Sequence, residues 1–173
     1  ETFATIRGGA GTEFSDTATT IEVQLYNGST TSNVWEVIDR APVLFDTSAL
    51  GANVVISAAT LSLYGTAKEN GASAQSVNIV KATPASNTAL VAADYNIANW
   101  DMTQQATAIT IASYSTTAYN DFALNATGIG NISTTGISKF GWAISADYTN
   151  TDPGNAGAVN NYATANSADQ TGT

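Results

Sequence analysis

The acidic side chains are the residues through which this chain could most readily do chemistry. Glycoside hydrolysis needs only two carboxyl groups held at a set separation. None of the acids lies in a recognisable catalytic motif, and isolated acids are frequent in turns. We therefore interpret them as turn, capping and solubilising residues and expect no enzyme. The acids weighed for a catalytic pair are Glu13, Asp16, Glu22, Glu36, Asp39, Asp46, Asp94, Asp101, Asp121 and Asp147.

The composition excludes most other catalytic chemistry. The 173 residues include no His and no Cys. This removes Ser-His-Asp triads, thiolate nucleophiles and the usual zinc sites. The Gly-rich stretch at residues 8–11 lacks the Lys of a phosphate-binding loop, so we interpret it as a flexible turn.

Aromatic residues in polar loops are the best candidates for binding a sugar, because their rings can stack on a pyranose while Asn and Asp bind hydroxyls. Large aromatic residues also dominate protein cores, so each Trp could be packed instead. Trp142 alternates with Phe140 and Ile144 and is expected in the core. The predicted ligand-binding residues are Trp100, Tyr95, Asn99, Asp101, Trp35 and Tyr26.

A structural calcium ion is the one cofactor considered, since Ca²⁺ takes several carboxylate, amide and carbonyl oxygens. Asp147, Asn150 and Asp152 form the predicted metal set, and the loop at residues 94–101 could supply further oxygens. Neither segment has the spacing of an EF-hand. Turn Asp and Asn residues more often bond to their own backbone.

Charge limits the partners and the location. Five Lys and Arg against 14 Asp and Glu give a net charge of −9, without a basic cluster, so nucleic acid is not an expected partner. Charged residues make up only 11% of the chain, whereas about 25% is usual. No apolar run approaches the roughly 18 residues of a membrane span, so membrane insertion is not expected. The neutral polar surface favours an extracellular, cell-surface or virion protein.

Period-two alternation of apolar residues predicts a single all-β domain spanning residues 1–173, an antiparallel β-sandwich or jelly roll. Short helical turns are predicted at residues 46–50, with Asp46 as N-cap, and at residues 127–134. The stretch 41–45 is apolar on both faces and is predicted to be a central strand after Pro42. Strands are predicted near residues 2–7 and at 21–25, 41–45, 59–63, 77–79, 122–124 and 140–144.

The segment after Val159 is almost wholly polar. We expect nothing to close the sheet after Ala168, so the last strand is either missing or supplied by another chain through β-augmentation. In the second case residues 168–173 lie beside a strand of that chain.

Two neighbouring stretches resemble a known family. Residues 43–51 (Val-Leu-Phe-Asp-Thr-Ser-Ala-Leu-Gly) and 56–64 (Ile-Ser-Ala-Ala-Thr-Leu-Ser-Leu-Tyr) are similar to the LLRFDLSSLP…ISSATLRLY pattern of the DNRLRE-type, disaggregatase-related domains. The resemblance implies a β-jelly roll of secreted and surface proteins, grouped with carbohydrate-binding modules for acidic polysaccharides and also found in phage fibre or virion-like proteins. The matching motif is structural, so no binding residue is carried over. The scattered basic residues argue against an anionic glycan.

Two functions are therefore expected from the sequence. The first is a non-catalytic module that acts in adhesion or carbohydrate binding. The alternative is a structural subunit of an extracellular filament, or a phage decoration or fibre protein, assembled by β-strand complementation between copies. The corresponding partners are a glycan or copies of the chain itself, which would form a homo-oligomer.

Overall fold

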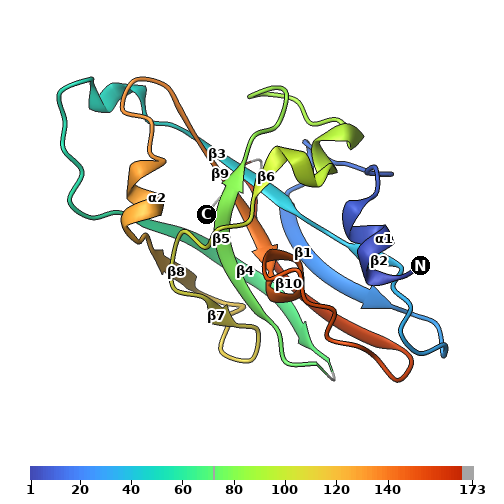
Figure 1. Cartoon of the computed structure of the whole chain (residues 1–173). Helices are drawn as coiled ribbons and strands as arrows, with labels where there is room; N and C mark the ends of the chain where they lie inside the picture. The colour runs from blue at the N-terminus through green and yellow to red at the C-terminus, as the bar shows by residue number, and fades with distance from the viewer. Residues whose placement is uncertain (72, 169–173) are drawn as a thin grey trace.

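The computed structural model describes residues 1–71 and 73–168, whose strands form two antiparallel sheets packed face to face (Figure 1). Within these ranges the longest helix has six residues. The predicted all-β sandwich is therefore confirmed.

The first sheet has the order β2-β1-β10-β4-β8, and the second has the order β3-β9-β5-β6, with β7 added beside β5. Along the sequence the chain passes back and forth between the two sheets, the winding expected of a jelly roll. The strands are β1 Thr20–Asn27, β2 Val37–Ile38, β3 Ala41–Asp46, β4 Thr60–Asn70, β5 Ser76–Ala82, β6 Trp100–Asp101, β7 Ile109–Thr110, β8 Tyr119–Ala123, β9 Ile137–Ile144 and β10 Val159–Asn166. The helices are α1 Phe3–Gly8, η1 Ser48–Leu50, η2 Ala92–Tyr95, η3 Ile97–Asn99, α2 Ala126–Gly130 and α3 Ser145–Tyr148.

The main core lies between the sheets and is built from alternate residues of each strand. Val23 and Leu25 of β1 and Phe140 and Trp142 of β9 all point into it. Trp142 is fully buried and stacks on Tyr114, with ring centroids 5.8 Å apart. The prediction that Trp142 belongs to the core is confirmed.

A second, smaller core covers the outer face of the second sheet. Val80, Ala82 and Ala143 face away from the main core and pack against Trp100. Gly141 lies directly beneath that indole, because a Cβ built there would be 2.3 Å from Trp100 Cζ3. The segment containing η2 and η3 thus folds over the sheet around Trp100.

The predicted strand near residues 2–7 is wrong, because this segment forms α1. The Thr2 hydroxyl accepts a hydrogen bond from the backbone N–H of Thr5 at 3.3 Å and caps the helix. Phe3 is buried and Ile6 is half-buried one turn later. Phe3 meets Trp35 edge-on, with ring centroids 6.5 Å apart. The i, i+3 spacing of the two apolar residues was the helical signal.

The two predicted helical turns are present with shifted bounds, but the prediction of Asp46 as N-cap is wrong. The N-cap of η1 is Thr47, which makes no side-chain capping hydrogen bond. Asp46 Oδ1 instead accepts a hydrogen bond from the Ser48 N–H at 2.9 Å, as in an Asx turn. α2 begins one residue earlier than predicted, with Asn125 as its N-cap.

The segment at residues 41–45 is a strand, but it is not central. β3 pairs with β9 on one side and is the end strand of its sheet. Its core-facing residues become more exposed along the strand: Ala41 is 5% exposed, Val43 is half-buried and Phe45 is 43% exposed. A sequence typical of a strand with neighbours on both sides therefore lies at a sheet edge.

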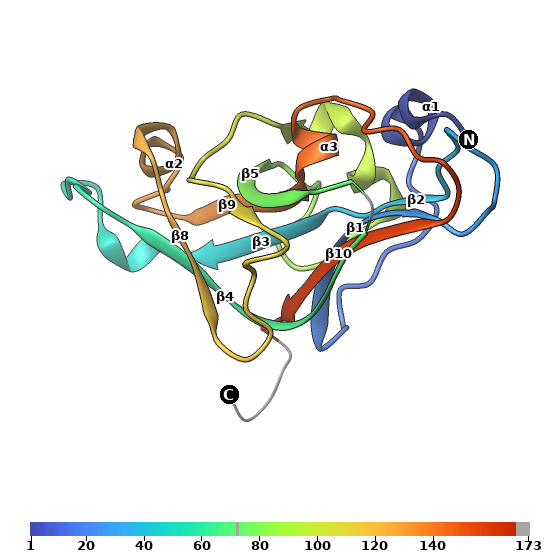
Figure 2. The same cartoon turned by 90° about the horizontal axis from the view of Figure 1, so that it is seen from below.

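The polar segment after Val159 forms a central strand that the sequence analysis did not predict. The expectation that nothing closes the sheet after Ala168 concerns residues outside the described ranges and stays a prediction. β10 lies between β1 and β4 (Figure 2). Its core-facing residues are Val159, Asn161, Ala163 and Ala165, all buried. Small side chains such as those of Ala163 and Ala165 are buried here because β1 and β4 flank the strand on both sides. Residues 169–173, on which the predicted contact with another chain mainly falls, lie outside the described residues.

We predict that Gly141→Ala destabilises the protein by about 1–3 kcal/mol, because the added methyl group overpacks the Trp100 ring. Urea unfolding followed by Trp fluorescence measures the change. Gly130→Ala is the matched control, since a Cβ there meets nothing within 4 Å. Equal stability of the two variants would contradict the packing described for Trp100.

Candidate functional site

A groove runs along β3, between β3 and the neighbouring edge of the first sheet. It consists of two pockets of about 340 Å³ and about 380 Å³. We call this continuous space the edge groove. The residues that line both pockets are Ser15, Ala18, Thr20, Ile21, Pro42 and Leu90.

The backbone of β3 presents to the edge groove groups that pair with no strand of the described residues. The Thr47 N–H bonds to Gly136 O, and this sets the alternation of the β3–β9 ladder. Val43 and Phe45 therefore bond to β9, while the backbone groups of Pro42 and Leu44 point into the groove. Pro42 has no N–H, which suits a position that faces away from the neighbouring strand.

The opposite wall of the edge groove is formed by β1, whose backbone groups also point into the groove. The Ser167 N–H bonds to Thr19 O, so the odd-numbered residues of β1 bond to β10. The backbone groups of Thr20 and Glu22 then point toward β3. Asp39 N–H bonds to Gln24 O and closes this side at one end. Among the described residues, no strand pairs with β1 at Thr20 and Glu22 on this side.

The floor of the edge groove is apolar. Ile21 and Val43 are half-buried and pack against the main core, while Phe45 is largely exposed. Phe14 and Val91, at the other end, are 56% and 47% exposed. The main core is thus incompletely covered along the edge groove.

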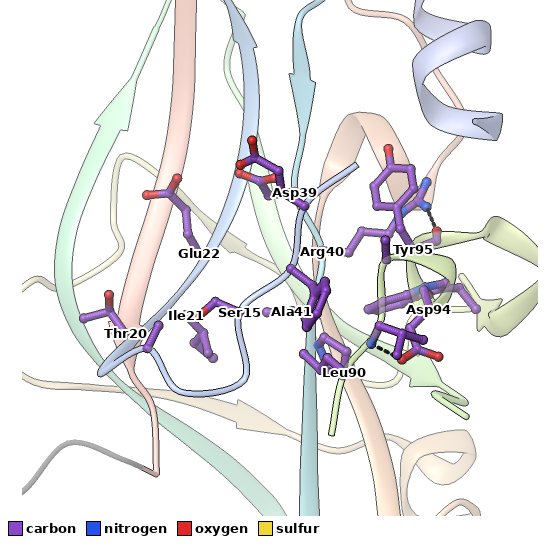
Figure 3. A pocket seen from close by; sticks show the side chains of 17 residues that line it. Ser15, Thr20, Ile21, Glu22, Asp39, Arg40, Ala41, Leu90, Asp94 and Tyr95 are labelled. Atoms are coloured by element: carbon purple, nitrogen blue, oxygen red, sulfur yellow. Dashed lines mark hydrogen bonds between the residues drawn. The ribbon is translucent and has the colours of Figure 1, made fainter. Parts of the chain in front are cut away.

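One end of the edge groove is acidic. Burial, and to a lesser extent the Glu13 carboxylate, raises the pKa of Asp39 to about 6. Burial, followed by the Asp39 carboxylate, also raises the pKa of Glu22. Figure 3 shows Glu22 on β1 and Asp39 just before β3, while the neighbouring Arg40 points toward Tyr95. Among the described residues, neither carboxylate forms an ion pair.

Arg40 is turned away because it is held by a buried ion pair. Its Nε and Nη2 donate to the Asp147 carboxylate at 2.6 and 2.9 Å, and both side chains are fully buried. Nη2 also donates to Arg7 O at 2.9 Å, and Nη1 donates to Tyr95 O. Arg7 Nε lies 3.0 Å from Asp147 Oδ1 and donates to the Asp147 carbonyl oxygen. One carboxylate thus joins α1, the start of β3, η2 and α3.

The structure brings two of the predicted ligand-binding residues to the edge groove. Trp100 and Tyr95 both line its acidic end. Trp100 is only 8% exposed and its Nε1 donates to Asp94 O at 2.9 Å. The Arg40 guanidinium lies 4.1 Å from the Tyr95 ring centroid, and the Tyr95 hydroxyl donates to Ile6 O. Both rings are therefore largely occupied by contacts within the chain.

The other four predicted residues lie apart from the groove lining. Asn99 donates to Ala93 O, and the exposed Asp101 accepts from the Thr103 N–H. Trp35 is fully buried, and Tyr26 is half-buried on β1. The sequence reasoning did not single out Phe14 or β3 as site elements. The sequence did contain a signal for β3, which is Pro42 within an apolar strand. Pro in a sheet is typical of an edge strand.

The three predicted calcium ligands make contacts within the chain. Asp147 binds the two arginines, and Asp152 Oδ1 accepts from Trp35 Nε1 at 3.0 Å and from the Gly154 N–H. Asn150 is exposed, with a φ of 51°. Among residues 1–71 and 73–168, no three acidic side chains converge as metal ligands would. Calcium binding at Asp147, Asn150 and Asp152 stays a prediction.

Comparison of the chain with protein-family models, curated proteins and solved structures finds no match. The resemblance to DNRLRE-type domains therefore stays an expectation from the sequence. In the part of the chain that the structure describes, no helix has the length and apolarity needed to cross a membrane.

We predict that Asp147→Asn destabilises the protein by about 3–5 kcal/mol, because it leaves buried arginine charge without its carboxylate. Urea unfolding at neutral pH measures the loss. Glu36→Gln removes an exposed acid and should change stability by less than about 0.5 kcal/mol. Similar values for both variants would show that the ion pair does not hold these segments together.

We also predict a pH-dependent effect of Asp39→Asn. The pKa of Asp39 is about 6 in the folded protein and near the ordinary 3.8 when unfolded, so the folded state binds more protons between these values. This carboxyl group therefore lowers stability as pH rises from about 4 to about 6.

Asp39→Asn should accordingly exceed the wild type in stability by about 1–3 kcal/mol at pH 7, and the gap should close near pH 4. Chemical unfolding at both pH values measures this gap. A difference that is the same at both pH values would show that ionisation of Asp39 is not its cause.

Proposed function

We propose that this chain is a non-catalytic β-sandwich module of an extracellular, cell-surface or virion assembly, and that it acts by receiving an extended strand from a neighbouring chain. The observation that supports this most is the position of β3. It is apolar on both faces, lies at a sheet edge, and directs the backbone groups of Pro42 and Leu44 into an open groove.

Open strand edges invite pairing with another chain unless they are protected. β3 is only partly protected. Pro42 removes one N–H, but residues 41–45 carry no charge. The loops at residues 13–18 and 86–91 flank the groove and meet through one exposed hydrogen bond, from the Leu90 N–H to Asp16 Oδ2 at 3.2 Å. A strand added here would gain backbone hydrogen bonds and cover apolar surface, as in β-augmentation.

Carbohydrate binding is the second candidate function. The exposed Phe14 ring lies in the same pocket as Glu22 and Asp39, which combines an apolar face with hydrogen-bond acceptors for sugar hydroxyls. This candidate predicts glycan binding, measured on an array of neutral oligosaccharides, that Phe14→Ala abolishes.

We predict that a seven-residue peptide of alternating Val and Thr binds the edge groove, and that Leu44→Pro weakens binding by about tenfold or more. The substitution removes an N–H that points into the groove while leaving the ladder with β9 intact. Amide NMR shifts of Thr20 and Glu22, which the wild type and the variant both retain, measure the binding by titration.

Ala123→Pro is the matched control, because the N–H of Ala123 points away from β4 at the opposite edge of the first sheet. It should leave the peptide affinity unchanged. Strand acceptance fails if no peptide binds at millimolar concentration, or if both proline variants behave alike.

A further inference from the structure

We infer that the strand received by the edge groove comes from a chain other than this one and carries a Lys or Arg at the end that lies beside Glu22 and Asp39. The inference rests on the proposed function and adds the chemistry of the partner. Three features of the structure support it in turn.

The first feature is the shape of the empty space. β3 spans Ala41–Asp46, and strands rise about 3.4 Å per residue, so an occupant pairing along it has about five or six residues. Alternate side chains of that occupant point toward Ile21, Val43 and Phe45, which the chain itself leaves partly uncovered. The occupant is therefore extended, with apolar residues at every second position.

The second feature is the charge at one end of the groove. A strand placed over Glu22 and Asp39 removes more water from carboxylates that are already partly buried and repel each other. Covering such charges without a partner is costly. Arg40 cannot compensate them, because Asp147 holds it. A basic residue on the incoming strand supplies the missing cation, and the fork of an Arg can reach two carboxylates.

The third feature is that residues 1–71 and 73–168 of this chain include no exposed apolar strand with a free basic side chain. Its most exposed apolar segment is residues 53–57, in which Val55 is 91% exposed, and that segment carries no charge. A net charge of −9 also makes copies repel one another. All five basic side chains of the described region are engaged: Arg7 and Arg40 with Asp147, Lys68 with the carbonyl oxygens of Ala112 and Tyr114, Lys81 with Asn131, and Lys139 with the Pro84 carbonyl oxygen.

The test uses the whole chain and three synthetic seven-residue peptides of alternating Val and Thr that end in Lys, Gln or Glu. We expect the Lys peptide to bind about tenfold more tightly than the Gln peptide, and the Glu peptide to bind more weakly than both. The double variant Glu22→Gln, Asp39→Asn should abolish this order while retaining affinity for the Gln peptide. Raised salt should reduce the preference for Lys.

The outcomes separate the inference from the proposed function. If no peptide binds, strand acceptance itself fails. If the three peptides bind equally well, strand acceptance stands and the requirement for a basic residue is overturned.

Light scattering of the chain alone tests the source of the strand. A monomer near 17.7 kDa at all concentrations is expected. Association that increases with concentration and is lost in Val55→Asp would overturn the inference. It would indicate that another copy of this chain donates the strand. Val55 is suited to this test because its 91% exposure makes a folding defect unexpected.

Discussion

The buried ion pair between Arg40 and Asp147 is the contact on which the arrangement of the edge groove depends. The two residues are 107 positions apart, and their side chains are fully buried. The pair joins α1, the start of β3, η2 and α3, and removing Asp147 would leave the buried Arg40 charge without its carboxylate. It also fixes the direction of Arg40. The same contact that locates the first residues of β3 thus keeps the nearest cation away from Asp39.

The edge groove exists because the β-sandwich is left open along one side. The inner faces of β1 and β3 belong to the main core, yet the strands do not pair with each other, and Ile21 and Val43 remain partly uncovered between them. Flanking loops narrow the opening without filling it. By contrast, the part of the core around Trp142 and Tyr114 is fully covered, and the two rings stack on each other.

Local patterns predicted the parts of this structure that depend on local chemistry. Alternation located β4, β9 and the core position of Trp142, and turn chemistry located the helical turn that follows Asp46. It missed β10 because Ala163 and Ala165 have weak strand preference, and their burial is decided by the neighbouring strands. The position of β3 at an edge, the partnership of Arg40 with Asp147 and the meeting of Glu22 with Asp39 all join residues distant in sequence. No period within a short window contains that information.

The central place of β10 has a consequence for the order in which the molecule can fold. Thr20 pairs with Asn166, and β1 and β4 are joined in one sheet only through β10, which lies between them. The first sheet therefore cannot be completed until residues near 166 have been synthesised. Such distant pairings slow folding, and the nascent chain stays extended and aggregation-prone while it waits. Delayed closure of this kind would keep the chain in a state that a translocation channel or a chaperone can handle.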